Sequence, residues 1–285
     1  MESFKLTDHS RWRNLRSRDG TELFCREWES FAPAKGTILV IPGLGEQSGR
    51  YLHVGDFFQQ AGFNVLAIDV RGHGRSGGSP VYAEGYDKFL DDVRTAIGLV
   101  KIHPLVVFGH SFGGQLALAL AAREEPNVVA YVASAPWLAL TSPPAAWLTG
   151  VASFLNVLYP KIRFPTRIER RQNSSDEVHL DSLADLELNH SFITVRAFFE
   201  ISEEGHRLLA NPHVNAPVLL AQGQPDPVTS TEASLAFFGR LKAPGKELLL
   251  YPGFLHELHN EKERARVLDD YLNWIDQRIL VTRAR

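Results

Sequence analysis

The chain has 285 residues but only one cysteine, Cys25, and no strong excess of either charge. A single cysteine cannot form an internal disulfide and excludes a cysteine-rich zinc site, which fits a reducing compartment. The net charge of −3, with no long run of one sign, indicates no nucleic-acid partner. The eleven histidines form no His-Glu-x-x-His pair, so we expect neither a metal nor a cofactor.

Long hydrophobic runs are also missing from the chain. The N-terminal stretch MESFKLTDHSRWR contains no apolar core of signal-peptide length, and no later stretch is long enough to span a membrane. Internal repeats and low-complexity segments are absent as well. We therefore expect a cytoplasmic protein that can bury a large core. No oligomeric state is predicted.

The most informative stretch is LVVFGHSFGGQLALALAAR, residues 105–123. A short valine-rich run predicts a buried strand, and the Ala/Leu-rich run that follows at once predicts a helix. Ser111 stands in the turn between them, with Gly109 and Gly113 two residues to either side. Small flanking residues let strand and helix approach closely, so the serine is held in strained geometry with its hydroxyl pointing outward. This is the Gly-x-Ser-x-Gly nucleophile elbow; a glycine-rich turn with an incidental serine is the alternative.

A serine nucleophile needs a base to remove its proton and a carboxylate to orient that base. In this architecture the acid and the histidine follow the serine in that order. Asp226 is the only acid in the loop after the apolar run 217–221, and a turn-forming aspartate is the alternative reading. His256 lies in the loop after the last apolar run, 247–251. His259 competes with it, but lies nearer the final helix.

The backbone groups that would stabilise an oxyanion are expected in two places. The buried run 37–41 is followed by Pro42-Gly43-Leu44-Gly45, where glycines allow the backbone to turn with its N–H groups exposed. We predict that the N–H of Leu44 and the N–H of Phe112 are the two donors. A plain strand-to-helix turn is the alternative for the first loop.

A second glycine-rich loop, residues 69–78, lacks both the spacing and the Gly-Lys-Ser/Thr ending of a phosphate-binding loop. We expect Asp69 and Arg71 to brace this loop. His73 precedes the serine, so it is expected to be a hydrogen-bonded loop residue and not the base.

Short apolar runs alternate with helical patterns along most of the chain, and Ser111, Asp226 and His256 occur in the required order. Together these features predict the α/β-hydrolase fold: a mostly parallel central sheet flanked by helices, with a helical lid inserted after the sixth strand. The Asp19-Gly20 pair between two extended runs predicts an antiparallel hairpin at the sheet edge. Expected boundaries are 1–136 and 216–285 for the core and 137–215 for the lid. Expected helices cover 52–61, 86–100, 116–122, 192–209, 232–241 and 261–279.

The lid is rich in large apolar residues, which suggests an apolar passage for an acyl chain. Its candidate substrate contacts are Trp137, Trp147, Leu148 and Val151, although packing of the lid onto the body would explain the same pattern. Lys161, Arg163, Arg167, Arg170 and Arg171 form a loose basic cluster, either solvated or attracted to an anionic lipid surface. Transient contact with a membrane through the lid is a further prediction.

Five segments together resemble the monoacylglycerol lipase/lysophospholipase family, of the serine-aminopeptidase-like group. They are LGEQSGRY (44–51), DVRGHGRSGG (69–78), GHSFGG (109–114), PDPV (225–228) and PGFLHELHNE (252–261). The resemblance implies that Ser111 is the nucleophile, His256 the base and Asp226 the acid, with Leu44 and Phe112 as oxyanion donors. One departure is Pro42, where the family commonly has histidine; proline leaves the following N–H groups in place.

The sequence thus predicts a serine hydrolase that cleaves carboxylic esters through an acyl-enzyme. The resemblance implies a small-molecule acyl lipid as substrate, such as a monoacylglycerol or a lysophospholipid. An aminopeptidase or amidase on the same triad is the first alternative, and it would need an acidic pocket from residues such as Glu46 or Glu84. A catalytically silent ligand-binding protein on this fold is the second.

Overall fold

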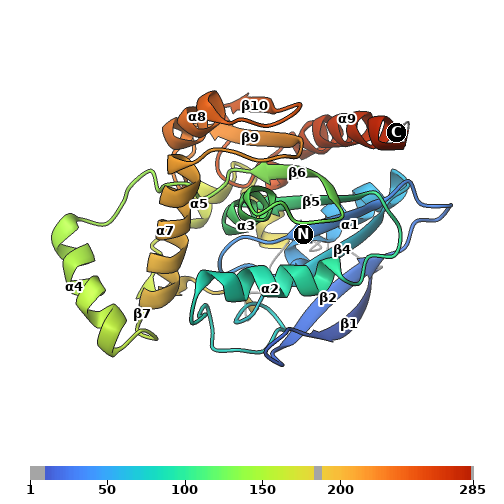
Figure 1. Ribbon diagram of the computed structural model, residues 1–285. Helices are drawn as coiled ribbons and strands as arrows, with labels where there is room; N and C mark the ends of the chain where they lie inside the picture. The colour runs from blue at the N-terminus through green and yellow to red at the C-terminus, as the bar shows by residue number, and fades with distance from the viewer. Residues whose placement is uncertain (1–9, 183–187, 284–285) are drawn as a thin grey trace.

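The computed structural model describes residues 10–182 and 188–283, and an eight-stranded sheet lies at its centre (Figure 1). The strand order is β1-β2-β4-β3-β5-β6-β9-β10. The bounds are β1 Arg11–Arg16, β2 Glu22–Trp28, β3 Thr37–Ile41, β4 Asn64–Asp69, β5 Leu105–His110, β6 Val128–Ser134, β9 Val218–Gln224 and β10 Glu247–Pro252.

The sheet is parallel except at one edge. β1 pairs antiparallel with β2, and β2 pairs antiparallel with β4, whereas the pairs from β4 through β10 are parallel. The predicted Asp19-Gly20 turn joins β1 to β2, with Gly20 at φ 87° and its N–H donating to the Ser17 carbonyl at 2.9 Å. Every residue of β3 and β5 is buried, as expected of parallel strands that are covered on both faces. The predicted mostly parallel sheet is confirmed.

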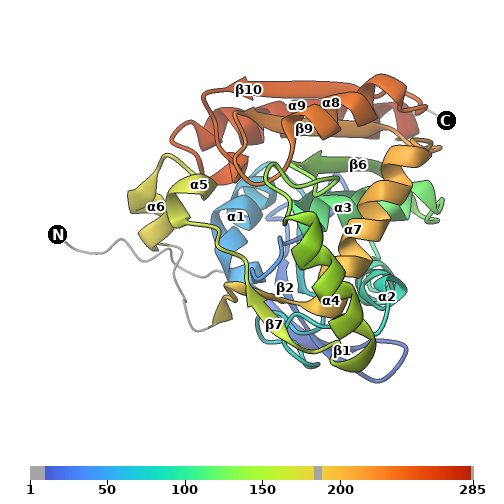
Figure 2. The same cartoon turned by 90° about the vertical axis from the view of Figure 1, so that its left-hand side faces the viewer.

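Helices cover both faces of this sheet (Figures 1 and 2). On one face, α1 (Leu52–Gln60) and α9 (Arg264–Arg283) contribute Phe58, Tyr271 and Trp274 to one buried cluster. On the other face, a second buried cluster includes residues of α2 (Tyr86–Ile97), α3 (Phe112–Ala122) and α8 (Thr231–Arg240). Among the described helices, none is both long and apolar enough to cross a membrane.

A long insertion follows β6 and faces the viewer in Figure 2. It contains α4 (Ala146–Leu158), β7 (Arg163–Pro165), α5 (Arg170–Asn173), α6 (Glu177–Ser182), β8 (Phe192–Thr194) and α7 (Val195–Ala210). β7 and β8 form a small antiparallel sheet, so the helix that was expected from residue 192 begins only at Val195. α7 buries Ala197, Ile201 and Leu208 in the main core, whereas α4 projects beyond it.

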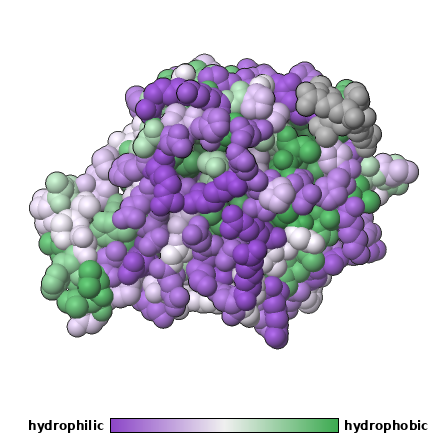
Figure 3. All heavy atoms as spheres, in the orientation of Figure 1, coloured by the Kyte–Doolittle hydropathy of each residue, from purple (hydrophilic) through white to green (hydrophobic). Residues whose placement is uncertain are grey.

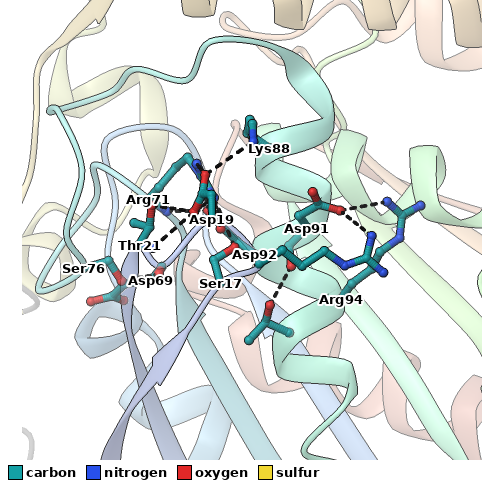
Figure 4. Close-up of polar contacts among 12 residues, drawn as sticks. Ser17, Asp19, Thr21, Asp69, Arg71, Ser76, Lys88, Asp91, Asp92 and Arg94 are labelled. Carbon is teal, nitrogen blue, oxygen red and sulfur yellow. Dashed lines mark hydrogen bonds and ion pairs between the residues drawn. The ribbon is translucent and has the colours of Figure 1, made fainter.

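The glycine-rich loop after β4 is braced by charged groups, as predicted. The Arg71 guanidinium donates to Asp92 of α2 at 2.6 and 2.8 Å and to Asp19 of the hairpin turn at 2.6 Å (Figure 4). Hydrogen bonds from Arg71 hold the pKa of Asp19 well below its usual value. Asp69 accepts from the backbone N–H of Ser48 at 2.6 Å. The loop is therefore tied to the hairpin, to α2 and to the segment that precedes α1.

Candidate active site

Ser111 lies in the tight turn between β5 and α3 with φ 54° and ψ −115°. A positive φ is costly for a residue with a side chain and persists only where the surroundings impose it. Here the Ser111 N–H donates to the Ser134 carbonyl at the end of β6 (2.9 Å), and the Ser111 carbonyl accepts from the N–H of Trp137 (3.0 Å). The neighbouring strand thus fixes the turn in its strained form.

The two glycines of the elbow are required by close backbone packing. A Cβ atom on Gly109 would overlap the carbonyl of Gly113, and one on Gly113 would overlap the carbonyl of Ile41 in β3. The start of α3 therefore packs directly on two strand ends, with no space for a side chain. Close backbone packing therefore explains why both positions are glycine, as the sequence pattern suggested.

The Asp226 carboxylate, in the loop after β9, is buried and fully occupied by donors. Its Oδ1 accepts from the N–H groups of Val228 (2.8 Å) and Thr229 (3.0 Å). Its Oδ2 accepts from Gln222 Nε2 (2.8 Å), Thr229 Oγ1 (2.8 Å) and His256 Nδ1 (2.9 Å). Burial raises the pKa of Asp226, but the charge of His256 and these hydrogen bonds outweigh burial, so the pKa is lowered. The carboxylate is held ionised and in one orientation.

The His256 imidazole is 4% exposed and bonds to Asp226 through Nδ1. Burial disfavours its charged form, yet the charge and hydrogen bond of Asp226 favour it more, so the pKa of His256 is raised. A neutral imidazole that donates from Nδ1 leaves Nε2 free to accept a proton. This is the tautomer that a general base requires.

His259, the competing histidine, lies nearby, with its ring 4.8 Å from the ring of His110 between centroids, but it makes no hydrogen bond to Asp226. Its ring stacks on Tyr51 at 4.8 Å between centroids, and neither ring nitrogen has a hydrogen-bond partner among the described residues. Burial lowers the pKa of His259 well below its usual value. Of the two histidines, only His256 is hydrogen-bonded to Asp226.

Ser111 and His256 line the same cavity, which has a volume of about 830 Å³. The ring of His110, the residue before Ser111, lies 4.7 Å from the His256 ring between centroids. The structure therefore places the elbow, the imidazole and the Asp226 carboxylate at one site, although they come from three distant parts of the sequence.

The predicted oxyanion donors lie on two sides of the elbow. Leu44 lines the cavity, and Phe112 begins α3, where the N–H groups of the first turn have no intrahelical acceptor. The Gly43 N–H, in contrast, is already used, because it donates to Glu46 Oε2 at 2.8 Å. Leu44 and Phe112 stay the predicted donors.

The insertion contacts the loop that carries Leu44. The N–H of His190 donates to the carbonyl of Gly45 at 2.8 Å. Gly45 has φ +75°, and a Cβ atom there would overlap the His190 carbonyl. Sequence reasoning did not find this contact, since nothing in the local pattern of the insertion points to a specific partner loop.

Part of the cavity lining is a buried cluster of charged side chains. Arg50 bonds to Glu257 through Nη2 (2.8 and 2.9 Å) and lies 3.3 Å from Glu46 through Nε. Tyr51 donates to Glu46 at 2.6 Å. Burial raises the pKa of Glu46, but Arg50 and the other donors bring it down to about 2. Arg50 and Glu257 were missed as site residues, although both lie inside motifs that were singled out, LGEQSGRY (44–51) and PGFLHELHNE (252–261).

The rest of the lining is largely apolar, and it includes some of the predicted substrate contacts. Trp137 and Leu148 line the cavity, as does Ala152, one turn after Leu148 on α4. Trp147 and Val151 are 73% and 51% exposed and are not lining residues. Trp147 and Val151 are four residues apart and lie on a neighbouring stripe of α4. When Leu148 and Ala152 face the cavity, this stripe is turned away from the cavity. The structure does not place them at the cavity, and their role as substrate contacts stays a prediction.

Within residues 10–182 and 188–283, no group of three or more His, Cys, Asp or Glu side chains is arranged to hold a metal ion. The groups that the cavity offers are a serine hydroxyl, an oriented imidazole and a buried charged cluster. This set suits nucleophilic attack on a carbonyl.

Comparison with known proteins agrees with this geometry. Monoacylglycerol lipase from Mycolicibacterium smegmatis is 31% identical over 90% of this chain and 93% of its own. Monoglyceride lipase from Rattus norvegicus is 29% identical over 95% of this chain and 92% of its own. A solved structure of a soluble variant of Saccharomyces cerevisiae monoglyceride lipase superposes with a TM-score of 0.83, at 22% identity over 98% and 99% of the two chains.

These findings define the protein first as an α/β hydrolase, by its fold and by the elbow at the end of β5. The model of the family "Serine aminopeptidase, S33" (Hydrolase_4) matches residues 32–263. The chain belongs to this family.

Proposed function

We propose that this carboxylic ester hydrolase cleaves monoacylglycerol-like lipid esters through an acyl-enzyme, with Ser111 as nucleophile, His256 as base and Asp226 as acid. The observation that carries the proposal is the 2.9 Å bond between His256 Nδ1 and Asp226 Oδ2, beside a cavity that the strained Ser111 also lines.

In the first half-reaction, Ser111 Oγ attacks the ester carbonyl carbon while His256 Nε2 takes the hydroxyl proton. The carbonyl oxygen becomes an oxyanion, which the N–H groups of Leu44 and Phe112 stabilise. Collapse of this intermediate breaks the bond to the alcohol oxygen. His256 gives its proton to the leaving alcohol, and the acyl group stays on Ser111.

In the second half-reaction, water replaces the alcohol. His256 removes a proton from water as the water oxygen attacks the acyl carbon, and then returns that proton to Ser111 Oγ. The free acid leaves and the enzyme is regenerated. Asp226 stabilises the imidazolium in both halves without taking a proton itself.

The cavity lining offers surface for both parts of a lipid ester. Apolar residues from α4, β8 and α7 supply surface for an acyl chain, and the lining also contains polar side chains for an alcohol to contact. The M. smegmatis and rat relatives are named monoacylglycerol and monoglyceride lipases, which supports the same substrate class.

The charges in the cavity do not decide between a neutral head group and a phosphate. Arg50 is paired with both Glu46 and Glu257. Even with Glu257 protonated, these three side chains carry no net positive charge for a phosphate to pair with. Arg167 and Arg170, however, line the same cavity and bring positive charge to it. A monoacylglycerol and a lysophospholipid therefore both stay candidate substrates.

The aminopeptidase alternative finds less support in the same residues. The Glu46 carboxylate already accepts hydrogen bonds from the Gly43 N–H and Tyr51 and is ion-paired with Arg50, so it is not free to bind a substrate amine. Glu84 is exposed and does not line the cavity. Because the family is described as serine aminopeptidase, amide substrates still belong in the test.

We propose that the exposed face of α4 docks on the lipid surface that holds the substrate. Trp147, Phe154 and Val157 are 73%, 66% and 78% exposed, an unusual concentration of apolar side chains on one helix. This face appears as the green patch at the lower left of Figure 3. A Phe154→Glu variant should bind neutral lipid vesicles less than wild type in flotation assays, with unchanged hydrolysis of a soluble p-nitrophenyl ester.

The function is tested by a hydrolysis panel that contains monoacylglycerols of several chain lengths, lysophosphatidylcholine, p-nitrophenyl esters and aminoacyl amides. We expect monoacylglycerol and p-nitrophenyl esters to be cleaved, and Ser111→Ala to lose at least about 10³-fold in turnover while staying folded. Near-full esterase activity in Ser111→Ala would refute the nucleophile assignment. Preference for amides would favour the peptidase alternative.

A further inference from the structure

The backbone amides on both sides of His256 are anchored by different means. The Leu255 N–H donates to the side-chain Oε1 of Glu261 at 2.8 Å. The Glu257 N–H donates to the carbonyl of Asn173, in the insertion, at 2.6 Å. The backbone that carries His256 is therefore held on one side by a buried carboxylate and on the other side by the insertion.

Glu261 is itself held by the insertion. Its Oε2 accepts from Ser175 Oγ (2.5 Å) and from the Ser175 N–H (3.1 Å), while its Oε1 holds Leu255. The side chain is 1% exposed. One carboxylate thus joins the backbone just before His256 to the segment between α5 and α6.

Further contacts seat the same segment on the histidine loop. Ser174 Oγ donates to the Asn260 carbonyl at 2.8 Å, and Arg264 pairs with Asp176 at 2.9 Å. Residues 173–176 therefore lie along the loop 255–261 as a continuous contact, which we call the bracket. The two segments of the bracket are separated by about eighty positions in the sequence, so no local sequence pattern predicts their contact.

We propose that Glu261 is a positioning residue for catalysis, through which the insertion holds His256 in line with Asp226. The proposal rests on the function proposed above and deepens it, because it gives the insertion a role in the chemistry as well as in covering the cavity. Glu261 does not touch substrate; it acts by fixing the backbone on which the imidazole is carried.

A carboxylate suits this position because it accepts hydrogen bonds on both oxygens from donors on opposite sides. Replacing it with glutamine turns one acceptor into a donor, which then faces either Leu255 N–H or the two donors of Ser175. One side of the bracket weakens, so the loop loses either its anchor at Leu255 or its tie to the insertion at Ser175. A displacement of about 1 Å at a catalytic group is enough to cost up to about 100-fold in rate.

The test compares Glu261→Gln, Ser175→Ala and the double variant with wild type, in kcat and KM for a p-nitrophenyl ester. We expect Glu261→Gln to lower kcat about tenfold or more with KM changed less than about twofold. Ser175→Ala should lower kcat less, and should have no further effect in the Glu261→Gln background because both act through one carboxylate. Additive losses in the double variant would overturn the proposal.

Glu204→Gln is the matched control for loss of a buried carboxylate. Glu204 is also 1% exposed, but it pairs with Arg123 and Arg207 away from the histidine loop. We expect this variant to lose thermal stability and keep the wild-type kcat. Equal kcat losses in Glu204→Gln and Glu261→Gln would mean that general destabilisation explains both, and would overturn the positioning role.

An NMR measurement tests the positioning role of Glu261 independently of the proposed function. The proton shared by His256 Nδ1 and Asp226 should give a low-field NMR resonance in wild type, and the signal should weaken or broaden in Glu261→Gln but not in Glu204→Gln. If wild type hydrolyses no ester, the proposed function fails while this resonance still reports the positioning. If wild type is active and Glu261→Gln keeps both kcat and the resonance, only the positioning role fails.

Discussion

Replacing Asp226 with asparagine is the most informative single change, because the structure dictates how the new side chain must lie. The two backbone N–H groups of Val228 and Thr229 point at Oδ1 and cannot turn away. The amide oxygen of asparagine must take that place. Its NH₂ group then occupies the Oδ2 position, where it faces His256 Nδ1.

An NH₂ group at that position donates to His256, so the imidazole must carry its proton on Nε2. This tautomer cannot accept the proton of Ser111, and the base is lost although every heavy atom stays in place. We expect kcat to fall about 10⁴-fold, or ~5 kcal/mol in activation free energy. The change also puts the NH₂ group against donors from Gln222 and Thr229, so thermal stability should fall as well.

The assay is steady-state hydrolysis of a p-nitrophenyl ester, with circular dichroism to confirm folding. Asp92→Asn is the matched control, because Asp92 is equally buried but pairs with Arg71 outside the site. This control should lose stability and keep kcat. An Asp226→Asn enzyme that is folded and within tenfold of wild type would refute the assigned role of Asp226.

Two further predictions follow from the same residues. The pKa of His256 is raised from 6.5, and the imidazole must be neutral to act as a base. In a pH–rate profile, kcat/KM should therefore fall as the pH decreases, with the midpoint of the fall above pH 6.5. A midpoint below pH 6.5 would contradict the pairing of His256 with Asp226. Gly113→Ala should lower the free energy of unfolding by about 1–3 kcal/mol in denaturant titrations, since its Cβ would overlap the Ile41 carbonyl. Gly239→Ala, in open space on α8, should instead be neutral or stabilising by up to ~1 kcal/mol, and equal losses would show that the overlap is not the cause.

Much of the fold could be predicted from local patterns. Buried parallel strands such as β3 and β5 are continuous apolar runs. The elbow has a recognisable pattern because the close approach of strand and helix leaves space only for glycine two residues to either side of Ser111. Asp226 could be predicted as the acid because it is the only acid in the loop after the apolar run 217–221. These patterns involve residues that are close together in the sequence, so a single sequence is enough to detect them.

The contacts of the insertion were harder to predict from the sequence, for a physical reason. The apolar stripe on α4 shows that a face is present but not what it packs against, so Trp147 and Val151 could not be told from Leu148. Contacts such as Glu261 with Ser175 join polar residues far apart in the chain, and a lone buried glutamate has no sequence signature. The lid boundaries, the cytoplasmic location and the oxyanion donors stay predictions.

Labelling with a fluorophosphonate probe, followed by peptide mass spectrometry to locate the adduct, tests most directly whether Ser111 is the nucleophile of the site that His256 and Asp226 complete. We expect one adduct, on the peptide that contains Ser111, formed more slowly in the presence of monoacylglycerol and absent in Ser111→Ala. An adduct on another residue, or ester hydrolysis that continues with Ser111 unlabelled, would contradict this assignment.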